Sequence, residues 1–376
     1  MKSQPEERGW AENGALVYYQ AFLLYEKPDA TMQQMLDDYR AGKIGSNETI
    51  RAHIEKNRRV IEYVVRAASI PHCDWGYDYS QGIDLTLANP QGIKRIAYLL
   101  EAESQLLAEQ GDYRTALERC LTTYQMAAHT VDRTLIPYLV GIAVSGRTNG
   151  TIERVLATMP GDIDTLTRLK AQVGRVQSAF PLLENILVQE GQVCTATMRK
   201  DKVQVVVHVL EEDNPNFATS LTGQRLLAGD EAFFERNRAH WSKAIDALVG
   251  VLKSGGPYAR TCAQLSELGK KLTEEYKDNP DATFTGFLLP ATERVYALAT
   301  RLQTHFNALR TAIDLYIMKA ETGSLPDTLP PDMPLDLFSG QPFEYEKAPD
   351  HFTLRCRTKE DPVDAEAKQY EFKLKP

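Results

Sequence analysis

Helical periodicity dominates this sequence and most constrains its fold. Apolar residues recur every three or four positions through most of the 376 residues, as they do on one side of an amphipathic helix. The longest such run covers 289–322, and Gly323 ends it. Because one helix cannot bury its own apolar side, the pattern predicts a mostly α-helical protein of antiparallel helical hairpins, arranged as a TPR-like or bundled array.

Glycine, proline and short polar breaks divide the periodic region into segments. The turn at Gly111-Asp112, followed by the small residue Ala116, is typical of the middle of a TPR hairpin. The β-branched run 203–210 fits a strand or a helix, and the helical patterns on both sides favour a helix. Helices are expected over 13–26, 29–41, 47–65, 91–110, 112–130, 131–159, 162–180, 182–198, 231–253 and 257–276.

The last fifty residues change from helical to strand periodicity. Polar and apolar residues alternate over 343–346, 351–356 and 370–374, with a Pro-Asp turn between the first two runs. This pattern predicts a small three-stranded antiparallel sheet whose apolar face is covered by the preceding long helix. The expected organisation is therefore 1–90 for N-terminal helices and an irregular loop, 91–288 for the hairpin array, and 289–376 for the long helix with the sheet.

Composition excludes several classes of protein. Hydrophobic residues make up 43% and charged residues 25%, which excludes wholesale disorder and a polytopic membrane protein. The longest apolar stretches, 135–144 and 203–210, are too short to span a bilayer, and the first eight residues are polar, unlike a signal peptide. A net charge of −8 without a basic cluster argues against a nucleic-acid partner.

Cysteine and catalytic motifs point away from the common metal and cofactor sites. Five widely spaced cysteines give no zinc pattern and no disulfide framework, although one bridge between distant cysteines stays open. The sequence lacks a dinucleotide-binding glycine motif, a P-loop, a metalloprotease HExxH motif and a serine-hydrolase elbow. No metal or cofactor is therefore expected. Glu101 and Glu103 are interpreted as part of a solvated helix face, and His240-Trp241 as a half-buried packing pair.

The segment 72–84 is the one dense group of polar and aromatic residues. It interrupts the helical pattern for longer than any other stretch of the first half, and long loops in compact domains are often functional or form a structured cover. Three interpretations follow: a cover over helix ends, which is favoured, a contact for a ligand or peptide, or a nucleophile pair of Cys73 and His72. The candidate ligand-binding residues are His72, Cys73, Asp74, Trp75, Asp78 and Tyr79.

The C-terminal segment 309–357 resembles the end of a type II secretion pseudopilin. After a helix it carries Gly323-Ser324-Leu325-Pro326, and then Asp336-Leu337-Phe338-Ser339-Gly340-Gln341-Pro342-Phe343. Pseudopilins have a similar run between helix and sheet, with a proline at the position of Leu337 and without an insertion like Ser339. They also have a hydrophobic N-terminal assembly helix that this sequence lacks, so the resemblance implies a pseudopilin-like component rather than a filament subunit.

A broader resemblance covers nearly the whole chain. The order of helices, the 71–79 loop, the turn at 111–117 and the C-terminal motif together look like an uncharacterised envelope-associated helical family of Planctomycetes. That family brings no assigned activity. It implies the same architecture and an exported or periplasmic location if a leader has been removed, and otherwise the location is cytoplasmic.

These observations favour a non-enzymatic role. Stacked helical pairs form extended surfaces, so the leading hypothesis is a helical scaffold that binds a protein or peptide partner at the cell envelope. The alternatives are a hydrolase-type enzyme with its site in the 72–84 loop and a pseudopilin-like component linked to type II secretion.

Overall fold

A computed structural model describes residues 13–87, 90–357 and 369–374. The polar N-terminal residues 1–8 lie outside this part of the chain. The described residues form fifteen α-helices and one small sheet, so the prediction of a mostly α-helical protein with a C-terminal antiparallel sheet is confirmed. The helices are α1 (Gly14–Leu24), α2 (Ala30–Arg40), α3 (Glu48–Lys56), α4 (Arg58–Ala68), α5 (Pro90–Glu109), α6 (Tyr113–Thr130), α7 (Leu135–Thr158), α8 (Ile163–Ala179), α9 (Leu183–Thr195), α10 (Val203–Asp213), α11 (Leu221–Ala228), α12 (Glu231–Ser254), α13 (Tyr258–Glu275), α14 (Thr283–Leu288) and α15 (Thr292–Thr322).

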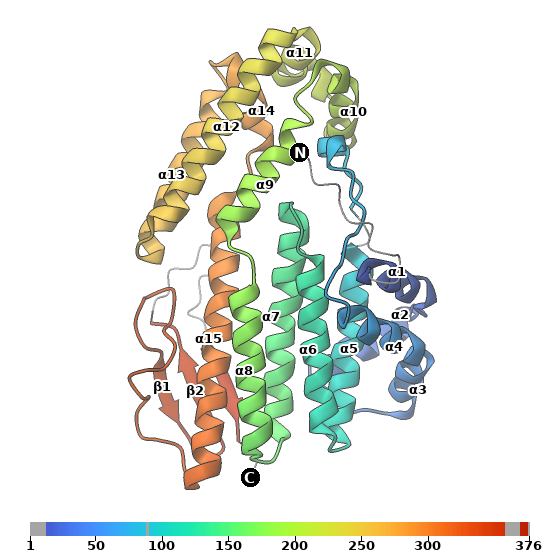
Figure 1. Cartoon of the computed structure of the whole chain (residues 1–376), viewed down its shortest axis with the longest axis vertical. Coiled ribbons are helices and arrows are strands. Elements are labelled where there is room, and N and C mark those ends of the chain that lie inside the picture. The colour runs from blue at the N-terminus through green and yellow to red at the C-terminus, as the bar shows by residue number, and fades with distance from the viewer. Residues whose placement is uncertain (1–12, 88–89, 358–368, 375–376) are drawn as a thin grey trace, which may run out of the picture.

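The molecule is elongated, with a bundle in its lower half (Figure 1). Helices α5 to α8 and α15 run side by side along the long axis, and α1 to α4 pack on one flank of this bundle. Helix α9 leads upward into a second group of helices, α10 to α14. The long helix α15 returns from that group into the bundle and presents its other side to the sheet.

Local sequence signals explain where several helices begin and end. The side chains of Asn13, Asp29, Asn47 and Asp112 each accept a hydrogen bond from the first turn of the helix that follows. Gly111 has a φ of 83°, a left-handed conformation that ends α5 and turns the chain into α6. These caps account for the agreement between the expected helices and the observed ones.

Three elements differ from the sequence expectation. The sequence predicts one helix over 47–65. This prediction is wrong, because the structure has two helices there, α3 and α4. Asn57 separates them because its buried side chain accepts a hydrogen bond from Glu26 N at 3.0 Å and donates to Glu26 O at 3.4 Å, which ties the break to the α1–α2 connection. The short helices α11 and α14 carry no pattern long enough to be predicted.

The β-branched run 203–210 is helical, as expected, and lies in α10.

The C-terminal sheet consists of β1 (Glu344–Lys347), β2 (His351–Arg355) and β3 (Gln369–Lys373), antiparallel in the order β1-β2-β3. Phe352 in β2 pairs with Phe372 in β3, and both are fully buried. Tyr316 of α15 packs its ring 5.5 Å from that of Phe352 and donates a hydrogen bond to Lys373 O at 2.6 Å. The long helix therefore covers the apolar face of the sheet, as the sequence predicts.

The apolar core has two parts that meet in the bundle. One part joins α1 to α4 with the inner faces of α5 to α7, and the other joins α5 to α7 with α8 to α15 and the sheet. Helices α5, α6 and α7 contribute to both parts. These three helices therefore connect the N-terminal flank to the rest of the molecule.

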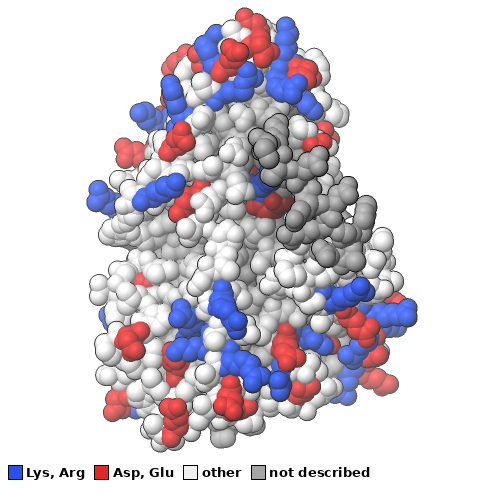
Figure 2. Space-filling view, in the orientation of Figure 1, with Lys and Arg blue, Asp and Glu red and all other residues white. Residues whose placement is uncertain are grey.

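Two further properties concern membrane and redox chemistry. Among the described residues, no helix combines the length and the apolar character needed to cross a bilayer. All five cysteines lie within the described ranges, and no disulfide joins any two of them. On the face drawn in Figure 2, acidic and basic side chains are interspersed.

Candidate functional site

Trp75 anchors the irregular loop that the sequence singles out. Its ring is buried, stacks on Tyr18 and Phe22 with centroid distances of 5.6 and 6.1 Å, and meets Tyr19 edge-on. The indole N–H donates a hydrogen bond to His129 O at 2.6 Å. Trp75 therefore fills the space between α1 and the end of α6, and it does not line an open cavity.

The second half of the loop is held at two further points. Tyr79 donates its hydroxyl to the carboxylate of Asp132, and the Arg133 guanidinium lies 4.8 Å from the Tyr79 ring centroid. Gly82 has a φ of 63° and approaches Thr197 so closely that an added Cβ would lie 2.8 Å from Thr197 N. The loop therefore bridges the N-terminal helices and the end of α9.

The other candidate residues of the loop have separate, local roles. The main-chain carbonyl of His72 accepts from Gly14 N at 2.8 Å. Asp74 and Asp78 are exposed, and the carboxylate of each accepts a hydrogen bond from a backbone N–H of its own turn. The structure thus distributes the six predicted residues along a cover, and it does not gather their side chains around one point.

Cys73 and His129 are the titratable groups near this loop with the chemistry of a nucleophile and a base. Burial, together with the carboxylates of Asp74 and Asp132, raises the pKa of the Cys73 thiol to about 12. Burial and the neighbouring His72 lower the pKa of His129 to about 4, and its two ring nitrogens lie 3.1 Å from Tyr18 Oη and 2.8 Å from Gln125 Nε2. At neutral pH the thiol is therefore protonated and the imidazole is neutral and hydrogen-bonded on both sides.

The interpretation of Glu101 and Glu103 as a solvated face is wrong. Their exposed fractions are 7% and 2%, because α6 and α7 pack over the side of α5 that carries them. Glu103 receives a hydrogen bond from Arg119 at 2.7 Å, yet burial outweighs the nearby arginines and raises its pKa. Buried carboxylates need such partners, since an uncompensated charge in the interior is costly.

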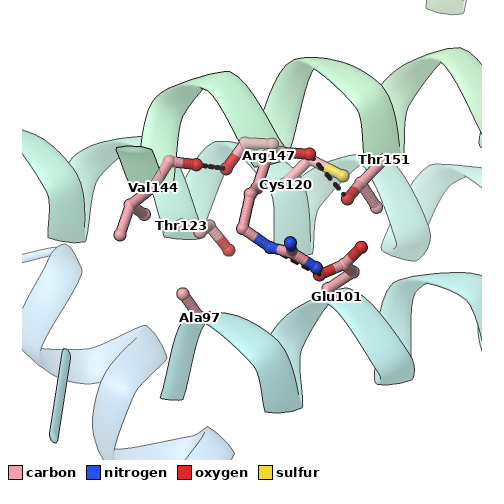
Figure 3. A pocket seen from close by; sticks show the side chains of 8 residues that line it. Ala97, Glu101, Cys120, Thr123, Val144, Arg147 and Thr151 are labelled. Atoms are coloured by element: carbon pink, nitrogen blue, oxygen red, sulfur yellow. Dashed lines mark hydrogen bonds and ion pairs between the residues drawn. The ribbon is translucent and has the colours of Figure 1, made fainter. Parts of the chain in front are cut away.

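Glu101 links two arginines of α7 to α5. Its Oε2 accepts from Arg147 Nη2 at 2.7 Å and its Oε1 from Arg154 Nη2 at 2.6 Å. Figure 3 shows Arg147 reaching from α7 toward Glu101, with Cys120 and Thr151 beside them. The gap between these side chains measures about 10 Å³, which is room for at most one water molecule.

A larger hollow opens on the other side of this ion-pair cluster. It has a volume of about 540 Å³ and lies between α2, α5 and α7. Three guanidiniums and two carboxylates line it, which leaves one net positive charge in a protein whose overall charge is −8. Its lining residues are Gln33, Asp37, Arg40, Ala41, Tyr98, Glu101, Arg147, Gly150 and Arg154.

The ring of Tyr98 contacts two of the three guanidiniums that line this hollow. The Arg40 and Arg147 guanidinium carbons lie 4.2 and 4.6 Å from the Tyr98 ring centroid, in cation–π geometry. Arg40 is only 6% exposed and pairs with Asp37, while its Nε has no hydrogen-bond partner among the described residues. One donor of the Arg40 guanidinium is therefore buried behind the wall of the hollow without an acceptor in the described part of the chain.

A second hollow of about 520 Å³ adjoins the first at Arg154, which lines both. Its walls combine Ile44, Ala108, Tyr113 and Val155 with the charged side chains of Lys43 and Glu109. We call the two hollows together the α2–α5–α7 groove. Its chemistry suits an anionic group at one end and an apolar group at the other.

Sequence reasoning missed this groove. Arg147 and Arg154 are seven residues apart and therefore share one side of α7, and Tyr98 and Glu101 share one side of α5. That spacing is visible in the sequence. Which helix faces which is not, so the arginines could not be assigned to the carboxylate that they bind.

The described residues contain no cluster of three or more histidine, cysteine or carboxylate side chains with metal-binding geometry. The carboxylate of Asp336, in the segment that resembles pseudopilins, is fully buried and accepts from Phe338 N, Ser339 Oγ and Arg357 N. Protein donors thus occupy this carboxylate. Asp336 therefore ties its own turn to the chain directly after β2.

Comparison of the chain with protein-family models, with curated proteins and with solved structures finds no match. The resemblances to pseudopilins and to the envelope-associated family stay predictions.

Proposed function

We propose that this chain is a non-enzymatic helical protein that binds a protein or peptide partner through the α2–α5–α7 groove. The observation that carries this proposal is the cluster of guanidiniums that lines the hollow, in which Arg40 and Arg147 both contact the ring of Tyr98.

The lining of the groove supports a protein or peptide as the ligand. Arginine and tyrosine are the residue types most enriched at the centres of protein interfaces, and here Arg40, Arg147 and Tyr98 stack together. Ile44 adds apolar surface that is 39% exposed. A mixed surface of this kind suits a partner with alternating polar and apolar side chains.

The raised pKa of Cys73 and the packing of Trp75 support a role without catalysis for the loop 72–84. A nucleophilic cysteine needs a lowered pKa, and burial raises that of Cys73 to about 12. Trp75 fills the space under the loop with aromatic contacts. These features suit a cover that holds α1, α6 and α9 together.

A peptide-display selection on the immobilised full chain tests the proposal. Selected peptides are then measured against Gly150→Leu, in which the new side chain occupies the groove, since a Cβ at this position already lies 3.7 Å from Arg154 Nη1. Gly250→Leu is the matched control, because Gly250 also lies within a helix and has open space around it.

We expect selected peptides to bind the wild type and Gly250→Leu equally, and to lose most of their affinity for Gly150→Leu. Circular dichroism confirms that both variants are folded. Peptides that bind all three proteins alike, or a selection that yields no specific peptide, would refute a binding role for the groove.

A further inference from the structure

The groove has features that select among peptides, and the following inference rests on the proposed function. Arg40 lines the groove with a side chain that is 94% buried, as follows from its exposed fraction of 6%. Its ring contact with Tyr98 at 4.2 Å and its ion pair with Asp37 fix the guanidinium in place. A fixed guanidinium loses little entropy on binding and is well suited to a planar carboxylate.

Arg147 and Arg154 provide further donors at the same hollow. Glu101 occupies Nε and Nη2 of Arg147 and Nη2 of Arg154. The side chains of Arg147 and Arg154 are 45% and 38% exposed, although Arg154 Nε itself is buried. An incoming oxyanion can therefore meet the exposed ends of the two α7 arginines beside the buried guanidinium of Arg40.

The net charge of the hollow favours a carboxylate over a phosphate as the bound group. The hollow carries Arg40, Arg147 and Arg154 against Asp37 and Glu101, a net charge of one. One carboxylate neutralises that charge, whereas a phosphate dianion would leave an excess negative charge beside two resident carboxylates. The site thus favours the side chain of an aspartate or a glutamate.

The adjoining hollow accounts for the next part of the ligand. Ile44, Ala108 and Val155 provide apolar contact there. Gln105 also lines it. This second hollow therefore fits an apolar residue and its backbone.

We infer that the α2–α5–α7 groove recognises an acidic residue followed by an apolar residue in an extended peptide. The carboxylate binds between Arg40, Arg147 and Arg154, and the apolar side chain packs beside Ile44 and Val155.

Two matched peptides test this inference, taken from the groove-dependent peptides of the selection described above. One keeps its acidic residue and the other has the corresponding amide, and both are amidated at the C-terminus. Fluorescence anisotropy with the full chain should show binding about tenfold or more weaker for the amide, since a hydrogen bond to a charged group is lost. Replacing the following apolar residue by glycine should also weaken binding.

Protein variants locate the carboxylate. Arg147→Gln should reduce the preference for the acidic peptide; Glu101 keeps its hydrogen bond from Arg154, and circular dichroism checks that the variant is folded. Arg199→Gln is the control for net charge, because Arg199 is exposed and pairs only with Asp201 in its own turn. This control should leave the preference unchanged.

The outcomes separate the two proposals. If selected peptides depend on the groove but bind equally as acid and amide, the carboxylate inference is overturned while the binding role stands. Competition by inorganic phosphate at lower concentrations than acetate overturns the preference for a carboxylate. If no peptide depends on the groove, the proposed function fails, and the inference fails with it.

Discussion

Replacing Trp75 by alanine should destabilise the protein strongly, because the loop 72–84 is a cover whose main anchor is this side chain. The indole is 6% exposed, contacts three aromatic rings of α1 and donates a hydrogen bond to His129 O. Removing it leaves a cavity between α1 and α6 and a main-chain carbonyl without its donor.

The expected loss in the free energy of unfolding follows from the contacts of the Trp75 ring. Substitution of a buried tryptophan by alanine costs about 3–5 kcal/mol through lost burial and the cavity left behind. Trp75→Phe keeps most of the ring contacts but removes the N–H donor to His129, which costs about 1–3 kcal/mol. The two variants should therefore differ by about 2 kcal/mol in the free energy of unfolding.

Urea unfolding followed by far-UV circular dichroism measures these differences without relying on tryptophan fluorescence. Asp84→Asn, at an exposed position of the same loop, is the control and should leave the midpoint unchanged. If Trp75→Ala lowered the free energy of unfolding by less than about 1 kcal/mol, the loop would not be a cover, because surface substitutions have effects of about that size or smaller.

Three further predictions concern ionisable groups. Because burial lowers the pKa of His129 to about 4 from the ordinary value of 6.5, the folded state binds fewer protons than the unfolded state in this range. Stability should therefore fall as the pH drops from 6.5 to 4, by about 1.4 kcal/mol per unit at most, and His129→Gln should flatten the urea midpoint profile; an unchanged profile contradicts this. Burial also raises the pKa of Glu190, although Leu135 N donates to its carboxylate at 3.0 Å, so the cost of the buried charge grows as the pH rises through the ordinary value of 4.5. Glu190→Gln should raise thermal stability at pH 8 and give no gain at pH 4; equal gains at both pH values exclude this explanation. Finally, a rise in the pKa of Cys73 from 9.0 to about 12 reduces its thiolate fraction roughly a thousandfold. Mass spectrometry should show much slower iodoacetamide labelling of Cys73 in the native protein than in urea, and equal rates would disprove the shift.

Local periodicity was sufficient to predict the long helices and the sheet of this fold. The apolar spacing of 289–322 gave α15, and the alternation over 351–356 gave β2, because each pattern depends only on the geometry of its own segment. The turn at Gly111 was also predictable, since a left-handed residue favours glycine. Where a distant partner decided the local structure, as Glu26 does at Asn57, prediction failed.

The α2–α5–α7 groove was decided only by the tertiary structure. In the sequence, Glu101 is a charged residue on a helix, and such residues are usually solvated. It is buried because α7 packs against α5 and brings Arg147 and Arg154 to it. Helix formation depends on neighbours within one or two turns, whereas the pairing of charges across helices depends on which faces meet, and residues far apart in the chain determine that.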